Sequence, residues 1–451
     1  MATAFEQYFT SLQNKHIAVL GLGVSNRPLV RLLLSFGCRV TGCDRTPREK
    51  IDAEVLELES LGCNLRLGET YLDGVEADLV FRTPGMHPGN PAIVALAQHG
   101  AEVTSEMEVF FEVCPCKIIA VTGSDGKTTT TSLIAAMLKA AGKKVWVGGN
   151  IGTPLLPVCR EISPEDIAVV ELRSFQLMDM RRSPSVALVT NLAPNHLDVH
   201  KDMEEYVQAK KNIFRFQKEG DILILNADNA ITDSFTGNGI TKRFSRQHKA
   251  DGVWLDGNVI RRGDMAVLDT ADILLPGVHN IENYMAAILA VEGLVEDAII
   301  QHVAKTFGGV EHRIELVRVK DGVKFYNDSI ASSPSRTIAG LRSFREKVIL
   351  IAGGYDKQIP YDELGPEICA HVKKLYLNGA TAGQIRAAVE RCGGEMPEIT
   401  DCGDFASAVK AAAADAQTGD VVLMSPASAA FDQFKNFMVR GETFKKLVME
   451  L

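Results

Sequence analysis

Residues 117–142 read KIIAVTGSDGKTTTTSLIAAMLKAAG, and this stretch decides the fold class. Its first residues, Lys117–Val121, form a mostly apolar run, which is typical of a buried strand in a parallel sheet. A glycine-containing loop follows, and then an amphipathic pattern that predicts a helix to about Ala141, ended by Gly142. A buried strand, a glycine loop and a helix in that order predict an α/β protein that binds ligands at the carboxyl ends of its strands.

The loop itself has the residue types that phosphate binding needs. Glycines let backbone N–H groups approach a phosphate, the helix start adds positive potential, and a lysine and a hydroxyl can contact phosphates and Mg²⁺. The general phosphate-loop pattern has four residues between its glycines, whereas only Ser124 and Asp125 separate Gly123 from Gly126. The loop therefore favours nucleotide binding, and the alternative is a glycine-capped turn with Lys127 on the surface.

Strands and helices alternate along the rest of the chain. Residues 251–275 differ, because their short, turn-separated apolar segments predict an antiparallel meander. We expect three α/β domains: a Rossmann-like N-terminal domain at 1–108, a central domain with a P-loop-type loop and a mostly parallel sheet at 109–310, and a Rossmann-like C-terminal domain at 311–451. The other predicted strands are His16–Leu20, Arg39–Thr41, Ala77–Arg82, Val145–Val147, Ile167–Glu171, Val186–Thr190, Asp221–Leu225, Lys324–Asn327, Lys347–Ala352, Lys374–Asn378 and Asp420–Ser425.

Composition narrows the class of protein. The 451 residues are 46% hydrophobic, which argues against intrinsic disorder, and they include nine scattered cysteines. With 48 Lys+Arg against 57 Asp+Glu the formal net charge is −9, which argues against nucleic acid as a partner. The N-terminus lacks a signal pattern, and no apolar stretch approaches the ~18–20 residues of a membrane span. We expect a soluble, cytoplasmic protein with no membrane partner, and a monomer.

A second glycine pattern lies near the N-terminus. Gly21 and Gly23 follow the first strand, and Asp44 comes about twenty residues later, as in half of a dinucleotide-binding fingerprint. The third glycine of that fingerprint is replaced by Asn26. A tight turn and a nucleotide or phosphate site both fit this pattern, and a nicotinamide-dependent dehydrogenase is the competing function.

Potential metal ligands follow several strands of the central segment. Asn150 lies in GGNIG, Glu171 in ELRSFQL and His196 in NLAPNHLDVH. A carboxylate, a threonine hydroxyl and phosphate oxygens suffice for Mg²⁺, and histidine would be an unusual addition. His196 and His200 have the spacing of a zinc pair, but no third ligand has the right spacing. Taken singly, each of these residues fits a structural role, and Lys210 fits a solvated helix lysine.

Two further groups of polar residues lie near the expected boundary at 310. Asn280 and Asn283 share one face of a helix start, where asparagine caps helices or hydrogen-bonds an adenine edge. Arg313 and Asp328 open the third domain and could reach a nucleotide, since ligand sites favour domain interfaces. Salt-bridged surface is the alternative for this pair.

The ordered set of motifs resembles the Mur ligase family. GSDGKTTT, GGNIG, ELRSFQL, NHLD, HNxxN, HRxE, NDS and SPASAAFDQF occur in one order along nearly the whole chain. The C-terminal DQF-KNF-x-x-R-G-x-x-F stretch favours the branch that adds D-glutamate. The resemblance implies an ATP-dependent amide ligase of peptidoglycan precursor synthesis that uses UDP-N-acetylmuramoyl-L-alanine, D-glutamate, ATP and Mg²⁺, with two ions expected.

The resemblance also implies roles for individual residues. Lys127, His196 and Lys210 are the implied catalytic residues, and Lys210 matches a lysine that becomes carbamylated. The implied metal ligands are Thr128, Glu171, His196 and Lys210. The implied ATP contacts are Gly123, Ser124, Asp125, Gly126, Lys127, Thr128, Thr129, Asn280, Asn283, Arg313 and Asp328. The implied UDP-substrate contacts are Val24, Ser25, Asp44, Arg45, Thr83 and Asn150. The implied D-glutamate contacts are Asp356, Lys357, Phe431 and Phe437.

The chain departs from the family pattern at several positions. Ile330 stands where a lysine is common, Ala430 where a serine contacts glutamate, and Arg173 where the ELSSFQ motif has a serine; Tyr355 interrupts the GGDGK loop. A sibling ligase that adds another amino acid and a folate polyglutamate synthase are competing interpretations, and Ile330 and Ala430 would favour a third, a non-catalytic ATP-binding regulator. The first segment, which suits a UDP-sugar, argues against the synthase.

Overall fold

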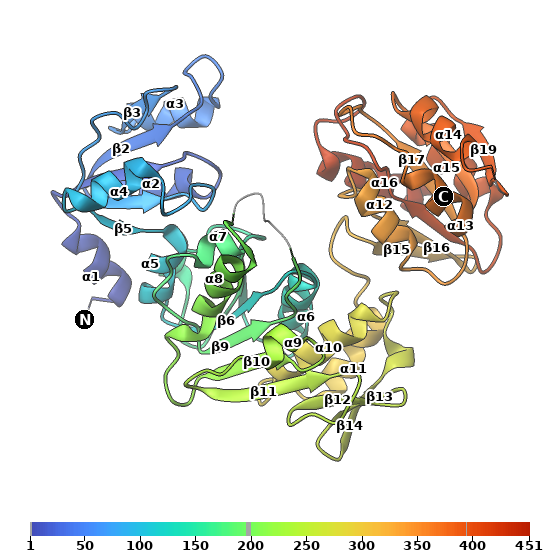
Figure 1. Cartoon of the computed structure of the whole chain (residues 1–451), viewed down its shortest axis with the longest axis horizontal. Helices are drawn as coiled ribbons and strands as arrows, with labels where there is room; N and C mark the ends of the chain where they lie inside the picture. Colours follow the sequence, from blue (N-terminus) through green and yellow to red (C-terminus); the bar gives the residue numbers. More distant parts are fainter. Residues whose placement is uncertain (1, 195–199, 394) are drawn as a thin grey trace. The chain divides into compact units, whose positions relative to one another are not determined.

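The computed structural model describes residues 2–194, 200–393 and 395–451, and within them it contains three β-sheets flanked by helices (Figure 1). The chain divides into two compact units, residues 1–272 with 281–304 and residues 273–280 with 305–451. The first unit holds two sheets and the second holds one. The predicted α/β fold class with mostly parallel sheets is confirmed, while the boundaries at 108 and 310 stay predictions.

The N-terminal sheet is parallel throughout and has the order β3-β2-β1-β4-β5. The strand order reverses between β1 and β4, and the crevice outside such a point is where open α/β sheets bind ligands. The loops that follow these two strands begin at Gly21 and Thr83. The elements are α1 Ala4–Ser11, β1 His16–Leu20, α2 Asn26–Ser35, β2 Arg39–Asp44, α3 Ala53–Ser60, β3 Asn64–Leu67, β4 Leu79–Arg82, α4 Pro91–Gln98, β5 Glu102–Thr104 and α5 Glu106–Val113.

The central sheet has the order β14-β13-β12-β11-β10-β9-β6-β8-β7. Its elements are β6 Lys117–Thr122, α6 Lys127–Ala140, β7 Val145–Gly149, η1 Cys159–Glu161, β8 Ile167–Glu171, α7 Ser174–Leu177, β9 Val186–Val189, α8 Met203–Arg215, β10 Ile222–Asn226, α9 Ala230–Asp233, β11 Ile240–Ser245, β12 Val253–Asp256, β13 Val259–Arg262, β14 Met265–Asp269, η2 Thr270–Asp272, α10 His279–Ala290 and α11 Asp297–Thr306.

Strand β6 lies between β8 and β9, parallel to both. In this register Val121 is paired with Glu171 and Thr122 with Val189, so the loops after all three strands start at one edge of the sheet. Strands β12, β13 and β14 pair in antiparallel fashion, which confirms the meander. Strand β11 was not predicted, because only the last two of its six residues are buried and its sequence lacks an apolar run.

The C-terminal sheet has the order β15-β16-β20-β17-β18-β19, and β15 is its antiparallel edge strand. The prediction missed β15, a half-buried edge strand with a mixed sequence. The elements are β15 Glu315–Lys320, β16 Val323–Asn327, α12 Pro334–Leu341, β17 Val348–Gly353, α13 Leu364–His371, β18 Val372–Asn378, α14 Ala382–Glu390, β19 Glu398–Asp401, α15 Phe405–Asp415, β20 Val421–Met424 and α16 Phe437–Glu450.

Helix α8 packs on the sheet next to β6 and β9 (Figure 1). The side chain of Asp202 caps its first turn by accepting the N–H of Glu205. Its buried face consists of Tyr206, Ala209, Lys210, Ile213 and their neighbours, so one lysine lies among apolar residues. A lysine is almost never fully buried unless it has partners, and its presence here points to a function of this face.

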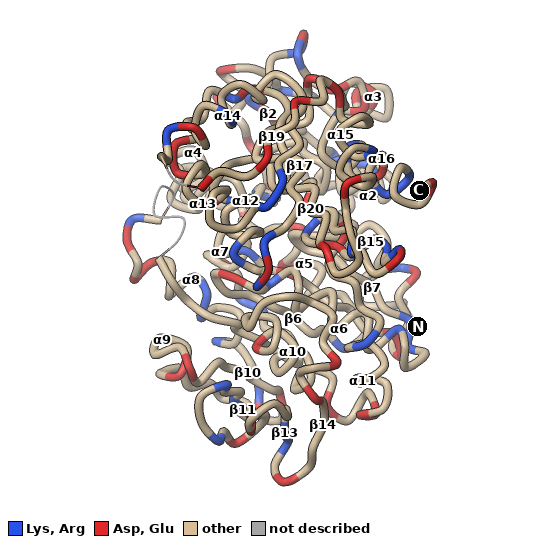
Figure 2. Tube along the Cα trace, turned by 90° about the vertical axis from the view of Figure 1, so that its right-hand side faces the viewer, with Lys and Arg blue, Asp and Glu red and all other residues tan. Residues whose placement is uncertain are grey.

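Charged residues of both signs are interspersed along the described chain (Figure 2). No helix among the described residues has the length and apolar character that crossing a membrane requires. All nine cysteines lie in the described part of the chain, and none forms a disulfide. The cellular location and the expected absence of a nucleic-acid partner stay predictions.

Gly353 ends β17 with φ 115°, and a Cβ atom there would lie 1.9 Å from the carbonyl oxygen of Asn378. We expect Gly353→Ala to destabilise the C-terminal unit by more than about 1 kcal/mol, since both the backbone conformation and the contact disfavour a side chain. Hydrogen exchange of peptides from β17 and β18 in the full chain measures this loss as faster exchange.

The matched control is Gly383→Ala in helix α14, where no atom lies within 4 Å of the added Cβ. That change should stabilise the unit by roughly 0.5–1 kcal/mol, since alanine has the higher helix propensity. Equal protection in the two variants would contradict the argument.

Candidate active site

The loop after β6 is packed directly against the residues that follow β9. Gly123 has φ 146°, and a Cβ atom on it would lie 2.0 Å from Oγ1 of Thr190. The N–H of Ser124 donates to the carbonyl of Asn191 at 2.8 Å, and the N–H of Asp125 donates to its side-chain oxygen at 3.0 Å. Two residues that the sequence analysis did not single out, Thr190 and Asn191, therefore fix the shape of the loop.

Helix α6 begins at Lys127, directly after Gly126 in the left-handed conformation. The Lys127 ammonium folds back and donates to the carbonyls of Gly123, at 3.0 Å, and Ser124, at 2.8 Å. Thr128 and Thr129 are in the first turn of α6, and Thr128 is buried. The loop and the helix start thus combine glycines, a cation and hydroxyls, which is the chemistry of a phosphate site.

Asn283 lies beside the same loop. Its Oδ1 accepts a hydrogen bond from Oγ1 of Thr130 at 3.2 Å, and a Cβ atom on Gly126 would lie 2.3 Å from it. Asn280 is in the same first turn of α10, and its side-chain amide donates to the carbonyl of Pro276 at 2.7 Å. The two asparagines are buried, so neither is a simple solvated helix cap.

Glu171 closes β8 and is completely buried. Its Oε1 accepts a hydrogen bond from the side-chain amide of Asn150, whose backbone N–H donates to the Glu171 carbonyl at 2.8 Å. Its Oε2 has no hydrogen-bond partner among the described residues. A buried carboxylate oxygen without a donor is costly, so this side chain fits a bound cation. His196 lies outside the described residues.

Lys210 reaches the loop from α8 and is buried to 2% exposure. Its ammonium donates to Oγ1 of Thr122 at 2.8 Å and to the carbonyl of Gly123 at 3.0 Å. Burial, and next the positive charge of Lys127, lower the pKa of Lys210 well below its ordinary value, although Glu171 opposes this shift. Lys127, Glu171 and Lys210 thus lie around one loop at the carboxyl edge of the central sheet.

A cavity of about 380 Å³ opens at the strand-order reversal of the N-terminal sheet. Its lining includes the predicted contacts Asp44, Arg45 and Thr83, together with residues that the sequence analysis missed. The missed residues are Tyr71, Gly85, Met86, His87 and Asn90, and the last four lie in the turn Thr83-Pro84-Gly85 and the loop that follows it. A strand ending at a turn of this kind was the available signal for that loop.

Asp44 is a fixed anion in this cavity. Burial raises its pKa, but hydrogen bonds from the backbone N–H groups of Thr46 and Leu22 outweigh burial, so the net pKa lies below its ordinary value. Val24 is 76% exposed, and Ser25 lines a separate cavity of about 30 Å³.

Asn26 replaces the third glycine of the dinucleotide fingerprint, and the structure shows what it does. Its amide donates to the carbonyls of Gly21, at 2.8 Å, and Leu20, at 3.4 Å. The side chain is 5% exposed and fills the space that a glycine would leave open. This arrangement disfavours the dehydrogenase interpretation, in which the third glycine allows close packing of the helix on the strand.

Asp328 follows β16 and is buried in the C-terminal unit. Its carboxylate accepts hydrogen bonds from Oγ of Ser425 at 2.7 Å and from the N–H of Ile314 at 3.3 Å. Burial raises the pKa of Asp328 to about 7, against the effect of these donors. Arg313 is exposed in the preceding turn, where its N–H donates to the carbonyl of Val310.

The four predicted D-glutamate contacts lie on three segments of the C-terminal unit. Asp356 accepts hydrogen bonds from the N–H of Gln358 and the amide of Gln384, and Lys357 is exposed. Phe431 is 60% exposed and packs edge-to-face on Tyr355, with the ring centroids 5.9 Å apart. Phe437 begins α16. An exposed aromatic pair beside a lysine is a surface that an amino acid could contact, and Tyr355 was not predicted as part of it.

The loop before α16 depends on Arg440, which the sequence analysis quoted only within the C-terminal motif and to which it gave no role. This arginine is 2% exposed and donates to the carbonyls of Ser428, Ala429 and Ser329 and to Oγ of Ser329. Burial lowers its pKa to about 10. Arg440 therefore holds the SPASAA segment to the segment after β16.

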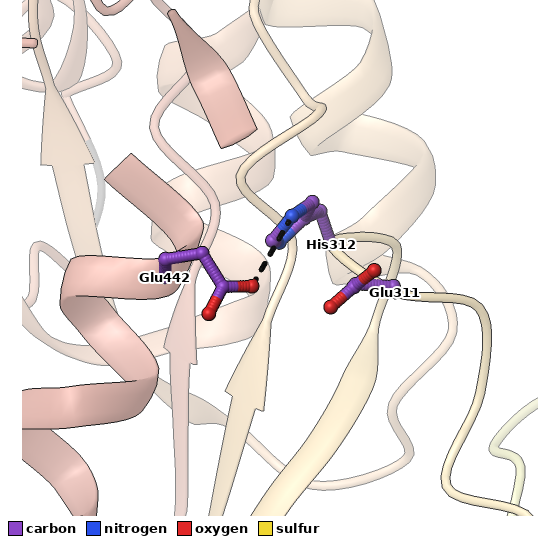
Figure 3. A group of neighbouring side chains, drawn as sticks. All are labelled: Glu311, His312 and Glu442. Atoms are coloured by element: carbon purple, nitrogen blue, oxygen red, sulfur yellow. Dashed lines mark ion pairs between the residues drawn. The ribbon is translucent and has the colours of Figure 1, made fainter. Parts of the chain in front are cut away.

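Glu311, His312 and Glu442 form a cluster of possible ligand atoms within the described C-terminal unit (Figure 3). The ring of His312 faces Glu442, with 3.8 Å between Nε2 and the nearest carboxylate oxygen. The ammonium of Lys445 pairs with Glu311 at 2.5 Å and with Glu442 at 2.9 Å. Because the chain supplies its own cation, this cluster is an ion-pair network.

The raised pKa of Asp328 predicts how stability depends on pH. The folded state binds this proton more tightly than the unfolded state, so the contribution is present below about pH 4 and is lost as the pH rises to about 7. The whole effect is on the order of 4 kcal/mol. Asp328→Asn should remove this pH dependence. The unfolding temperature of the variant, relative to that of the unmodified protein, should therefore rise between pH 5 and pH 8.

Asp362→Asn is the control, because Asp362 pairs with Arg391 on the surface. That change should shift the unfolding temperature by a similar, small amount at every pH. Parallel pH profiles for Asp328→Asn and the unmodified chain would contradict the buried-proton argument.

Comparison with known proteins places the chain in a family. Residues 121–291 match the model of the Mur ligase middle domain, and residues 312–428 match the Mur ligase, glutamate ligase domain. A protein of Acetivibrio thermocellus named UDP-N-acetylmuramoylalanine–D-glutamate ligase is 53% identical over 99% of both chains. Proteins of the same name from Ruminiclostridium cellulolyticum and Clostridium novyi are each 48% identical over the full length of both chains.

Solved structures agree on the fold. The UDP-N-acetylmuramate-alanine ligase of Thermotoga maritima has a TM-score of 0.59 at 18% identity and covers 97% of this chain, with all of its own chain matched. A UDP-N-acetylmuramoyl-L-alanyl-D-glutamate–2,6-diaminopimelate ligase has a TM-score of 0.58 at 18% identity, covering 98% of this chain and 94% of its own. The full-length relatives and both domain matches together establish that the chain belongs to the Mur ligase family.

Proposed function

We propose that this chain joins D-glutamate to UDP-N-acetylmuramoyl-L-alanine in an ATP-dependent reaction. An ordinary carboxylate does not react with an amine at neutral pH, so the L-alanine carboxylate must first be activated. Transfer of the γ-phosphoryl group of ATP gives an acyl phosphate, the amine of D-glutamate attacks its carbonyl carbon, and phosphate leaves as the amide forms. The product would enter peptidoglycan precursor synthesis.

The observation that carries the proposal is the set of charges around the loop after β6. Phosphoryl transfer between two anions requires neutralisation of charge in a site that excludes water. Lys127 lies within 3.0 Å of two loop carbonyls, and its flexible stem would let it turn to the phosphates when ATP binds. The positive end of α6 and the glycines Gly123 and Gly126 support the same assignment.

The unpartnered Oε2 of Glu171 and the buried Thr128 hydroxyl have the chemistry of a magnesium site. When bound, Mg²⁺ supplies positive charge that offsets the charge developing on the phosphate oxygens. In this proposal Glu171 and Thr128 hold one ion, and Lys210 and His196 contribute to a second through the resemblance to the family. Asn150 orients the Glu171 carboxylate through its amide hydrogen bond.

Lys210 would act in this site as a carbamate. The ammonium first loses one proton. The neutral amine then attacks CO₂, forms an N–C bond and releases a second proton, so two protons leave as the cation becomes an anion. The buried position among Thr122, Gly123 and Tyr206 supports the proposal, because an uncompensated ammonium is costly there. A carbamate oxygen next to Glu171 would place two anionic ligands beside the phosphate loop.

The 380 Å³ cavity of the N-terminal sheet would bind the uridine diphosphate part of the substrate. Thr83 and Arg45 offer a hydroxyl and a cation there, and the fixed carboxylate of Asp44 offers an acceptor. Asn150 and Ser25 would contact the sugar that leads from this cavity toward the phosphate loop.

The C-terminal unit would bind D-glutamate. Lys357 offers a cation for a carboxylate, while Phe431 and Phe437 offer apolar contact. Ala430 is buried and has no hydroxyl, so the contact to glutamate that the family pattern makes through serine must come from another group. The exposed pair of Tyr355 and Phe431 is the available replacement surface. The nucleotide contacts Arg313 and Asp328 lie in the same unit. In this proposal the enzyme acts as a monomer.

The test is phosphate release by the full-length protein with ATP, Mg²⁺ and UDP-N-acetylmuramoyl-L-alanine. We expect release only when D-glutamate is added, and none with L-glutamate, L-alanine, L-lysine or meso-diaminopimelate. Formation of the amide product, followed by mass spectrometry, must match phosphate release one to one. Activity with a diamino acid on the longer precursor would overturn the proposal in favour of a sibling ligase.

Two lysines of helix α6 provide a matched pair of controls. Lys127→Met should lower kcat by more than about 10²-fold, because it removes the cation nearest to the phosphates. Lys139→Met, in the exposed last turn of the same helix, should leave kcat within about twofold. Equal activity of the two variants would show that the phosphate loop is not the reacting site.

Carbamylation of Lys210 has a spectroscopic test that does not depend on turnover. Incubation with ¹³C-bicarbonate should give a ¹³C carbamate NMR signal in the protein, which disappears in Lys210→Arg because the guanidinium stays protonated. Lys211→Arg, on the same helix and next to it, should keep the signal. A spectrum without a protein-bound carbamate, or one unchanged in Lys210→Arg, would contradict the proposal.

A further inference from the structure

Arg82 is a buried charge of the first unit whose guanidinium is fully hydrogen-bonded. It lines the same cavity of about 30 Å³ as Ser25. It ends β4, is 1% exposed, and all five N–H groups of its guanidinium have acceptors. Nε and Nη2 donate to the two carboxylate oxygens of Asp179, at 3.0 and 2.5 Å. The remaining donors reach the carbonyls of Thr83, Met86 and Phe175, at 3.2, 2.6 and 3.3 Å.

These acceptors belong to two segments that lie far apart in sequence. Thr83 and Met86 line the 380 Å³ cavity of the N-terminal sheet. Phe175 and Asp179 lie four and eight residues after Glu171, in and after the short helix α7. The Arg82 side chain therefore joins the wall of the 380 Å³ cavity to the segment that follows Glu171, the candidate metal ligand.

The neighbouring loop residue makes a second, weaker connection. His87 also lines the cavity, and its Nε2 lies 3.5 Å from the carboxylate of Glu205 on α8, the helix that carries Lys210. The two side chains are 39% and 34% exposed, so this ion pair by itself contributes little to stability. The loop after β4 is thus linked to both segments that carry a buried charge of the phosphate site: through Arg82 to the segment after Glu171, and through His87 to helix α8, which carries Lys210.

We propose that Arg82 is a positioning residue that couples occupancy of the N-terminal cavity to the geometry of the Glu171 segment. The proposal rests on the assignment of the cavity to uridine diphosphate and of Glu171 to the metal site. Arg82 would touch neither ligand. It would instead bring residues 172–179 into register with the loop that contacts the first substrate.

The physical basis is the cost of separating a buried charge from its partners. If a ligand in the cavity moves the carbonyls of Thr83 and Met86, Arg82 must follow them or leave buried donors unmatched. The bidentate contact then carries the movement to Asp179, because its fork geometry fixes both distance and direction. Coupling of this kind is reciprocal, so the metal-bound nucleotide must also change the affinity for uridine diphosphate.

The test uses binding by the full-length protein without turnover. The dissociation constant of a non-hydrolysable ATP analogue with Mg²⁺ is measured by calorimetry, with and without saturating uridine diphosphate. In the unmodified protein we expect the two constants to differ by about fivefold or more. In Arg82→Met the ratio should fall to within twofold of one, while each ligand alone still binds.

Asp179→Asn is the second variant, since it weakens the same bond from the other end and removes no residue from the cavity wall. It should lose the coupling too, which keeps the test informative if Arg82→Met does not fold. Arg31→Met, which removes an exposed ion pair to Glu57 in the same sheet's helix layer, should keep the unmodified ratio. A lost structural role alone would lower the active fraction without changing this ratio.

The outcomes separate the inference from the function on which it rests. An unchanged ratio in Arg82→Met or Asp179→Asn overturns the coupling role and leaves the cavity assignment intact. A ratio of one in the unmodified protein does the same. Failure of uridine diphosphate to bind the unmodified protein overturns the cavity assignment and the coupling role together, and D-glutamate-dependent phosphate release then decides separately whether the ligase function stands.

Discussion

The absence of space around Gly123 is the constraint on which the central site depends. An added Cβ atom would lie 2.0 Å from Oγ1 of Thr190, so the loop after β6 can only have its observed path if residue 123 lacks a side chain. That contact fixes the loop against the end of β9, where Asn191 accepts hydrogen bonds from its N–H groups. The register that places Glu171 opposite Val121 then sets the carboxylate at the same sheet edge. The close packing of Gly123 on Thr190, together with this register, brings the residues that follow β6, β8 and β9 to one edge of the sheet.

Charge in this site is incomplete within the chain itself. Among the described residues, the Glu171 carboxylate has one oxygen without a donor, and the Lys210 ammonium has a hydroxyl and a carbonyl as acceptors in place of a carboxylate. Burial of such groups is tolerated only when something else supplies the missing partner. A divalent cation next to Glu171 and conversion of Lys210 to an anion would each remove one cost, and together they would remove both. This complementarity is a physical reason for proposing the metal and the carbamate together.

The features that could be predicted from sequence are those whose cause is local. Strand β6 and the loop before Lys127 follow from an apolar run, two glycines and a helix start, so their arrangement required no knowledge of distant residues. Parallel pairing then predicts that Glu171 ends at the same edge. Arg82 gave no local sign, because its partner Asp179 lies 97 residues away and arginine at a strand end is usually solvated. Arg440 stands in the quoted C-terminal motif, but its partner Ser329 lies 111 residues away, so its structural role gave no local sign either. The edge strand β15 lacked the alternation that marks a half-buried strand.

Among the described residues, each of the three sheets has a buried cation beside its carboxyl edge, and each of these cations donates to at least one backbone carbonyl. Arg82 binds the turn after β4, Lys210 binds the loop after β6, and Arg440 joins the segment after β16 to the one after β20. Loops at this edge must expose N–H groups to anionic ligands, which leaves carbonyls pointing back into the protein without helix or strand partners. The two arginines each reach several such carbonyls at once, and Lys210 reaches one, so each cation holds the turn that it contacts. In the proposed function the positive charge of this acidic chain therefore has two uses: some cations contact anionic ligands, and the buried cations hold the loops that would bind those ligands.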